Sequence, residues 1–324
     1  MPRFFSPDSY WNQPIPVDAE ADPRNDVFMN ALAGPDGGPL FINLRQWTIP
    51  VYEVGPDTPR RTVHQRLLDP ERLQRPCRWG KWTDREKWFS HGPGFGKDVP
   101  IPDGAQPDPF GDAHWAMVDW TTRTAWDVWA CRIRPDGEYE SFTGMKYPLD
   151  GTGVWRTENF PAVRDGDSIH FHGPSRAAGV PAIAGLIMHD EVLAGRIEHK
   201  IAFASHYNAW KEFVYPAAWT DGFRRAGVPE GALLQLDPAL DLGQFALSPA
   251  ARVIARALQE YGMVNVDNAG GSAIYAEGLY GDREKTWEGI LDPHGLKAIP
   301  IECYRMLKLG EVTRMGDHPA GPRD

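Results

Sequence analysis

His114-Trp-Ala-Met-Val-Asp-Trp120 and Ala125-Trp-Asp-Val-Trp-Ala-Cys-Arg-Ile133, joined by Thr121-Thr-Arg-Thr124, form the stretch that decides the fold. Both segments alternate in residue character with a period of two, which places successive side chains on opposite faces of a strand. The connection between them is short enough for a turn between antiparallel neighbours. We therefore predict a β-hairpin here.

The rest of the chain favours the same kind of structure. Its 33 glycines and 30 prolines are spread along all 324 residues, which is typical of many short strands joined by turns. We predict further strands at 49–54 and within 138–173, and a second hairpin that pairs Met263–Asp267 with Ser272–Ala276. The predicted fold is mainly β, an antiparallel β-sandwich or jelly-roll-like domain with two or three peripheral α-helices.

Three segments have helical signals. A short helix is predicted near 26–32. A longer one over 189–204 has Asp190 as its N-cap and an aliphatic stripe through Leu193, Ile197, Ile201 and Ala204. The third covers 248–261, where Ser248 is an N-cap, Pro249 is the first helical residue and Gly262 ends the helix.

We expect one β-rich domain over residues 1–324 with a loop insertion at about 61–110. That insertion contains Trp79, Trp82 and Trp88 among many charged residues, followed by a Gly- and Pro-rich loop. Loops of this length in a compact chain are more often functional than idle. These tryptophans are therefore candidates for substrate binding, since aromatic faces stack on sugar rings.

Composition excludes several classes of function. A net charge of −10 argues against nucleic acid as a partner, because binding phosphate requires a basic face. No run of 18 apolar residues occurs, so no membrane insertion is expected. Phosphate-binding loops, dinucleotide fingerprints and zinc-protease motifs do not occur either, and the three cysteines lack metal-ligand spacing. No cofactor and no metal are predicted.

Histidines and carboxylates supply the candidate catalytic groups. His170 and His172 would share one strand face and could hold zinc only with ligands from elsewhere, or simply form hydrogen bonds. On the predicted helix 189–204, Glu191, Glu198 and His199 lie opposite the aliphatic stripe, either lining a cleft or forming a solvated face. Paired carboxylates in a cleft are suited to acid–base cleavage of a glycosidic bond.

Two further pairs lie where loops meet strands. Asp112 and His114 open the first hairpin, where a histidine is well placed as a general base or as a hydrogen-bonded strand end. Asp267 and Asn268 end a strand at a turn, where both residue types are also common because they stabilise turns.

Nine segments, in this order over most of the chain, form a recurring pattern: Ser6–Pro16, Gly111–Asp119, Trp126–Trp129, Ala178–Leu186, Asp190–Glu191, Gly195–His199, Leu236–Asp237, Ala257–Met263 and Asp267–Asn268. With these segments the chain resembles a widespread group of uncharacterised secreted bacterial proteins. The resemblance implies no particular reaction. It directs attention to residues on the recurring pattern: Asp112, His114, Asp119, Glu191, His199 and Asp267. His170, His172 and residues 61–100 depart from that pattern.

From the first residues, which lack a basic region followed by an apolar run, we expect no export signal, whereas proteins of this group are usually exported. A minor tail protein of an actinobacteriophage, assembled in the host and displayed on the virion, would reconcile the two. A mature secreted form would do so equally. We therefore expect an extracellular or virion location, with a cell-envelope glycan as partner and other tail proteins as further partners.

The leading functional prediction is a protein that engages and cleaves a cell-envelope polysaccharide as a hydrolase or a lyase. The alternative is a non-enzymatic structural or receptor-binding tail protein. In the first case His114, Glu191 and His199 are the catalytic residues and converge in one pocket. The substrate-binding residues are Asp112, Asp267, Asn268, Trp79, Trp82 and Trp88.

Overall fold

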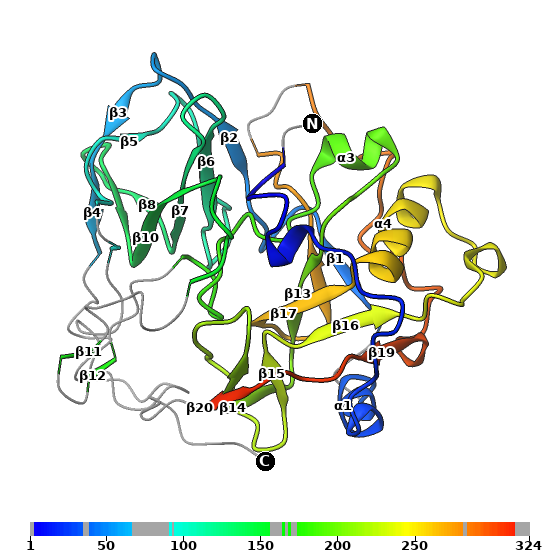
Figure 1. Cartoon of the computed structure of the whole chain (residues 1–324). Helices are drawn as coiled ribbons and strands as arrows, with labels where there is room; N and C mark the ends of the chain where they lie inside the picture. Colours follow the sequence, from blue (N-terminus) through cyan, green and yellow to red (C-terminus); the bar gives the residue numbers. More distant parts are fainter. Residues whose placement is uncertain are drawn as a thin grey trace.

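The computed structural model of the chain is mainly β and describes residues 3–34, 39–66, 91–92, 94–155, 164–165, 168–169, 174–280 and 284–314 (Figure 1). Strands account for 29% of the residues and helices for 13%, and most strand pairs are antiparallel. The prediction of a mainly β, sandwich-like fold is confirmed, with three α-helices in the described part of the chain.

The predicted hairpin forms the middle of a four-stranded sheet. Its strands are β6 (Trp115–Asp119) and β7 (Thr124–Trp129), which pair antiparallel. β10 (Thr143–Pro148) lies beside β7, and β2 (Val51–Glu53) lies parallel to β6, so the order is β10-β7-β6-β2. β7 ends earlier than predicted because the backbone turns at Ala130, which has a φ of 55°.

A six-stranded sheet forms the other half of the fold. In spatial order its strands are β1 (Phe41–Asn43), β18 (Ala273–Tyr275), β13 (Ile201–Ser205), β17 (Met263–Asn268), β16 (Leu233–Leu236) and β19 (Tyr304–Met306). β13 runs parallel to β17 and antiparallel to β18. It therefore lies in the interior of the sheet, with backbone partners on both sides.

Alternation along the strands separates the molecule into layers. In β13, Ile201 and Phe203 enter the core that the helices cover, whereas Ala202 and Ala204 enter a second core shared with the four-stranded sheet. The β6 strand alternates in the same way between this second core and a third one. The two sheets thus face each other across small alanine side chains, as in a sandwich.

Short strands complete the fold. They are β3 (Arg60–Arg61), β4 (Val63–Gln65), β5 (Val99–Pro100), β8 (Arg132–Ile133), β9 (Tyr139–Ser141), β11 (Arg164–Asp165), β12 (Ser168–Ile169), β14 (Asn208–Val214), β15 (Val228–Glu230) and β20 (Val312–Arg314). Three of them, β3, β4 and β5, fall within the segment predicted as an insertion. In the described ranges, no helix has the length and apolar character needed to cross a bilayer.

Two of the predicted helices are confirmed. α1 (Asn25–Leu32) lies against β19, and α4 (Pro249–Glu260) lies against β16. The Ser248 side chain accepts a hydrogen bond from the Ala251 amide, and Pro249 occupies the first turn, as the sequence predicts. Figure 1 shows both helices on the side of the six-stranded sheet.

The helix predicted over 189–204 is wrong beyond its first half. α3 covers only His189–Ala194, its N-cap is Met188 rather than Asp190, and Gly195 ends it with a φ of 77°. The chain then returns as a loop and enters β13. Of the residues that suggested a helical stripe, Leu193 is exposed on α3, Ile197 is buried in the loop, and Ile201 and Ala204 belong to a strand buried on both faces. Periodicity alone cannot distinguish such a strand from a helix.

The second predicted hairpin is also corrected. Both of its strands exist as β17 and β18, but they do not pair with each other, because β13 lies between them. The Asn268–Gly271 connection therefore crosses over one strand instead of forming a tight turn. The sequence between the two strands is typical of a turn, but β13 forms the backbone hydrogen bonds with both β17 and β18 that a hairpin would have formed between them.

Gly185 provides a test of how closely the chain packs onto β13. Gly185 and Gly195 both have positive φ, so alanine should cost about 1–2 kcal/mol of stability at either site. At Gly185 the added methyl would also overlap the Ala202 nitrogen and lie 2.9 Å from the Ile201 carbonyl carbon, whereas Gly195 has nothing within 4 Å. We expect Gly185→Ala to cost roughly 2 kcal/mol more than Gly195→Ala in urea unfolding. Equal losses would contradict this packing.

Candidate functional site

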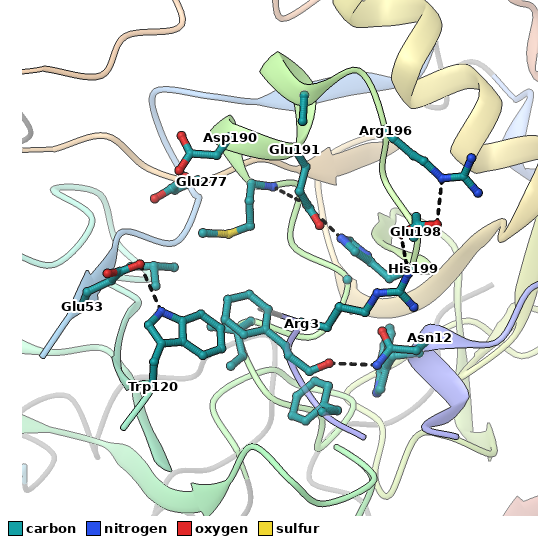
Figure 2. Close-up of a pocket in the computed structure, with 18 of the residues that line it drawn as sticks. Arg3, Asn12, Glu53, Trp120, Asp190, Glu191, Arg196, Glu198, His199 and Glu277 are labelled. Atoms are coloured by element: carbon teal, nitrogen blue, oxygen red, sulfur yellow. Dashed lines mark hydrogen bonds and ion pairs between the residues drawn. The ribbon is translucent and has the colours of Figure 1, made fainter. Parts of the chain in front are cut away.

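A cavity of about 630 Å³ lies where the N-terminal segment, the β2 edge and α3 meet. Figure 2 shows the side chains that line it. Its lining contains more charged side chains than any other type: Arg3, Glu53, Asp190, Glu191, Arg196, Glu198, His199, Glu277 and Lys285. Aromatic side chains form the next largest group: Phe4, Phe5, Trp11, Tyr52 and Trp120. This combination of carboxylates with aromatic faces is suited to an uncharged or charged polar ligand such as a sugar.

Glu191 is fixed at the start of α3. Its Oε2 accepts a hydrogen bond from the Met188 amide at 3.1 Å, which closes a capping box. The same oxygen lies 3.1 Å from Nε2 of His199, which the return loop brings back against the helix (Figure 2). Among the described residues, Oε1 of Glu191 has no hydrogen-bond partner. That oxygen is available to a ligand.

Both ring nitrogens of His199 face oxygen atoms, an arrangement that favours the protonated ring. Burial opposes its charge, but the Glu191 carboxylate and the hydrogen bond to it outweigh burial and raise the pKa of His199 above its usual value. The other ring nitrogen, Nδ1, donates to the Lys200 carbonyl at 2.7 Å. Both nitrogens are therefore occupied as donors, so His199 acts on the site by orienting and stabilising the Glu191 carboxylate.

Glu277 is a second carboxyl group of different character. It is 5% exposed, and burial raises its pKa above the usual value. Its Oε2 accepts from the His189 amide at 3.0 Å, the amide next along the chain from the one that Glu191 binds. Since successive Cα atoms are about 3.8 Å apart, the bound oxygens of the two carboxyls lie within roughly 10 Å of each other.

The aromatic wall comes from two distant parts of the chain. Phe4 stacks on Trp120 with ring centroids 5.4 Å apart and planes within 8°. The Trp120 indole donates to Glu53 at 3.0 Å. Trp11 fixes the N-terminal segment, because its indole donates to the Gly153 carbonyl at 3.0 Å and its own carbonyl accepts from the Lys200 amide.

The structure brings together only part of the predicted catalytic set. Glu191 and His199 share the cavity, but His114 does not line it. His114 precedes the first residue of β6, whereas Trp120 follows the last, and six residues of strand span roughly 20 Å. The prediction that all three residues converge in one pocket is therefore wrong. Glu191 and His199 do meet, but His199 lies on the loop after α3 and not on the same helix.

His114 belongs to a separate buried cluster around Arg176. Burial and the Arg176 charge lower the pKa of His114 to about 3, which keeps the ring neutral. Burial also raises the pKa of Asp267 well above its usual value, and the neighbouring Asp221 and Asp112 add to this effect. His114 and Asp267 thus both interact with Arg176, and Asp112 interacts with Asp267, although all three residues lie outside the cavity.

The fourth predicted residue of this group has a structural contact. Asn268 donates to the Asp221 carbonyl at 2.9 Å, and its backbone amide donates to Asp267. Arg176 is fully buried, donates to the Ala182 carbonyl at 3.0 Å and lies over the Tyr275 ring at 4.0 Å. We interpret this cluster as a polar network inside the fold.

The remaining predicted site residues, Trp79, Trp82 and Trp88, lie outside the described residues, as do His170 and His172. In the parts of the chain that the structure describes, no group of three or more His, Cys, Asp or Glu residues could hold a metal ion. Glu53, Trp120 and Glu277 line the cavity but were not among the predicted site residues. Trp120 directly follows β6, the first strand of the hairpin. An aromatic residue at the end of a strand was therefore the sequence feature that could have identified it as a binding residue.

Comparisons with protein-family models, with curated proteins and with solved structures found no match for this chain.

The Glu191–His199 pair predicts the titration of one histidine. Glu191→Gln removes the carboxylate charge but leaves His199 buried, so the pKa of His199 should fall below that of the unaltered protein. Histidine ¹⁵N NMR titration measures this, with the signal assigned by its absence in His199→Gln. Asp190→Asn, on the same helix, is the matched control. An unchanged pKa in Glu191→Gln would contradict the ion pair.

Asp127 lies next to the Arg176 cluster, and its raised pKa should make the free energy of unfolding depend on pH. Burial raises its pKa from 3.8 to about 7, against the hydrogen bonds from the Ala182 amide and the Tyr147 hydroxyl. The folded state therefore retains a proton that the unfolded chain releases, so this stabilisation is present at low pH and declines between about pH 4 and 7. In urea unfolding Asp127→Asn should flatten that decline, and the exposed Asp57→Asn should not. Parallel curves for Asp127→Asn and the unaltered protein would contradict this.

Proposed function

We propose that this protein binds a polysaccharide in the cavity and cleaves it by acid–base chemistry. One observation carries the proposal: the cavity holds two carboxyl groups in different electrostatic environments. Glu277 is buried and its raised pKa favours the protonated acid, whereas Glu191 lies in an ion pair with His199. Such a division of two carboxyls into an acid and a base is what glycoside cleavage requires.

The roles follow from these states. Glu277 donates its proton to the glycosidic oxygen as the bond to the sugar carbon breaks. Glu191, through its unbonded Oε1, accepts a proton, from water in a hydrolysis or from a sugar carbon in an elimination. The upper limit of roughly 10 Å between the two bound oxygens admits both the short and the long carboxyl separations of glycosidases.

The aromatic wall supports a sugar as the ligand. The Phe4–Trp120 pair presents apolar surface beside the carboxyl groups, and sugar rings place their C–H faces on such surfaces. The resemblance to exported bacterial proteins supports a location outside the cell or on a virion, where a cell-envelope glycan would be encountered.

A non-enzymatic, receptor-binding role is favoured by a different observation. Oε2 of both Glu191 and Glu277 is bound to backbone amides at the start of α3, which is a structural use of both groups. In that case the cavity would bind the glycan, as expected for a tail protein, without cleaving it.

Separate substitutions of the two carboxyls distinguish these functions. Glu191→Gln and Glu277→Gln should each lower the release of reducing ends from a cleaved polysaccharide about 10²–10⁴-fold, because each removes one proton-transfer group. The exposed Glu311→Gln is the control, and circular dichroism checks that each variant is folded. Glycan binding without any product from the unaltered protein would assign the cavity to binding alone. Neither binding nor product across a broad panel would contradict the proposal.

A further inference from the structure

The charges that line the cavity bear on which polysaccharide it takes. Four cationic side chains line it, and each is already paired with a carboxylate of the same lining. His199 pairs with Glu191 at 3.1 Å, and Lys285 pairs with Asp190 at 2.9 Å. Every cation of the described lining is therefore already engaged in an ion pair.

The remaining two cations share one carboxylate at the exposed rim. Arg3 and Arg196 both bind Glu198, and their side chains are 45% and 65% exposed. Water and salt screen charges at that level of exposure, so they attract an acidic sugar weakly. Two carboxyl groups of the lining have no ion pair among the described residues: Glu53 is exposed, and Glu277 is buried within reach of the Lys285 charge.

We infer that the substrate is an uncharged glycan and that the reaction is hydrolysis. This rests on the proposed function of the same cavity. A uronic acid with its glycosidic bond between Glu191 and Glu277 would place its own carboxylate beside the Glu191 carboxylate, where like charges repel. A lyase needs that sugar carboxylate to be neutralised before it can remove the adjacent proton, and each cation of the described lining is already bound to a carboxylate of the protein.

The hydrolytic step balances with water as the co-reactant. Glu277 gives its proton to the leaving oxygen, and the bond between that oxygen and the anomeric carbon breaks. Glu191 takes a proton from the water whose oxygen forms the new bond to the anomeric carbon. Exchange with solvent then restores the proton on Glu277 and removes the one on Glu191.

The test compares polymers that differ only in their carboxyl groups. The unaltered protein is given uronate-containing polysaccharides and the same polymers after carboxyl reduction, beside a panel of neutral glycans. We expect reducing ends from neutral or reduced polymers only, without absorbance at 235 nm. A product absorbing at 235 nm from a uronate polymer would overturn this inference and leave the proposed function standing. No binding and no product from any polymer would overturn both.

A rim variant provides an independent readout. Glu198→Gln releases Arg3 and Arg196 from their shared carboxylate, so the ratio of neutral to uronate affinity should fall roughly two- to fivefold, the size of an exposed ion pair. Glu311→Gln should leave the ratio unchanged. A ratio that Glu198→Gln does not alter, in a variant shown to be folded, would contradict the account of selectivity by paired cations.

Discussion

The position of β13 inside the six-stranded sheet is the constraint on which the rest of the structure depends. Ile201–Ser205 has backbone partners on both sides and a different core against each face. A segment in that place must be a fully extended strand, so α3 has to end before it. The end comes at Gly195, and the loop that follows returns His199 to Glu191. The fold and the candidate site therefore have the same origin.

The start of α3 concentrates the chemistry of the cavity. Two successive backbone amides, those of Met188 and His189, are bound by Glu191 and Glu277. Unpaired amides at a helix start attract carboxyl groups from wherever the chain can supply them. Here one comes from within the helix and one from the end of β18, and the histidine of the return loop gives them different electrostatic environments.

The buried cluster around Arg176 shows how the same residue types can serve the interior instead. Burial lowers the pKa of His114 to about 3 and raises the pKa of Asp267 well above its usual value, and Arg176 lies over an aromatic ring. Polar networks of this kind help to specify a unique core when their members are satisfied. Such a buried network contains the same residue types as an active site, and for this reason His114 and Asp267 were predicted from the sequence to be site residues.

The sequence by itself determined the features that depend on neighbouring residues. The hairpin at 114–133 follows from alternation, and α4 follows from Ser248, Pro249 and its apolar face, so both were predictable. Glu191 and His199 were selected for their residue types and do meet in the cavity. Only the tertiary structure decided that 201–205 is a strand, that β13 separates β17 from β18, and that Glu277 joins Glu191. These outcomes depend on pairing between segments that are far apart in the chain, and such pairing leaves no periodic signal within a single segment.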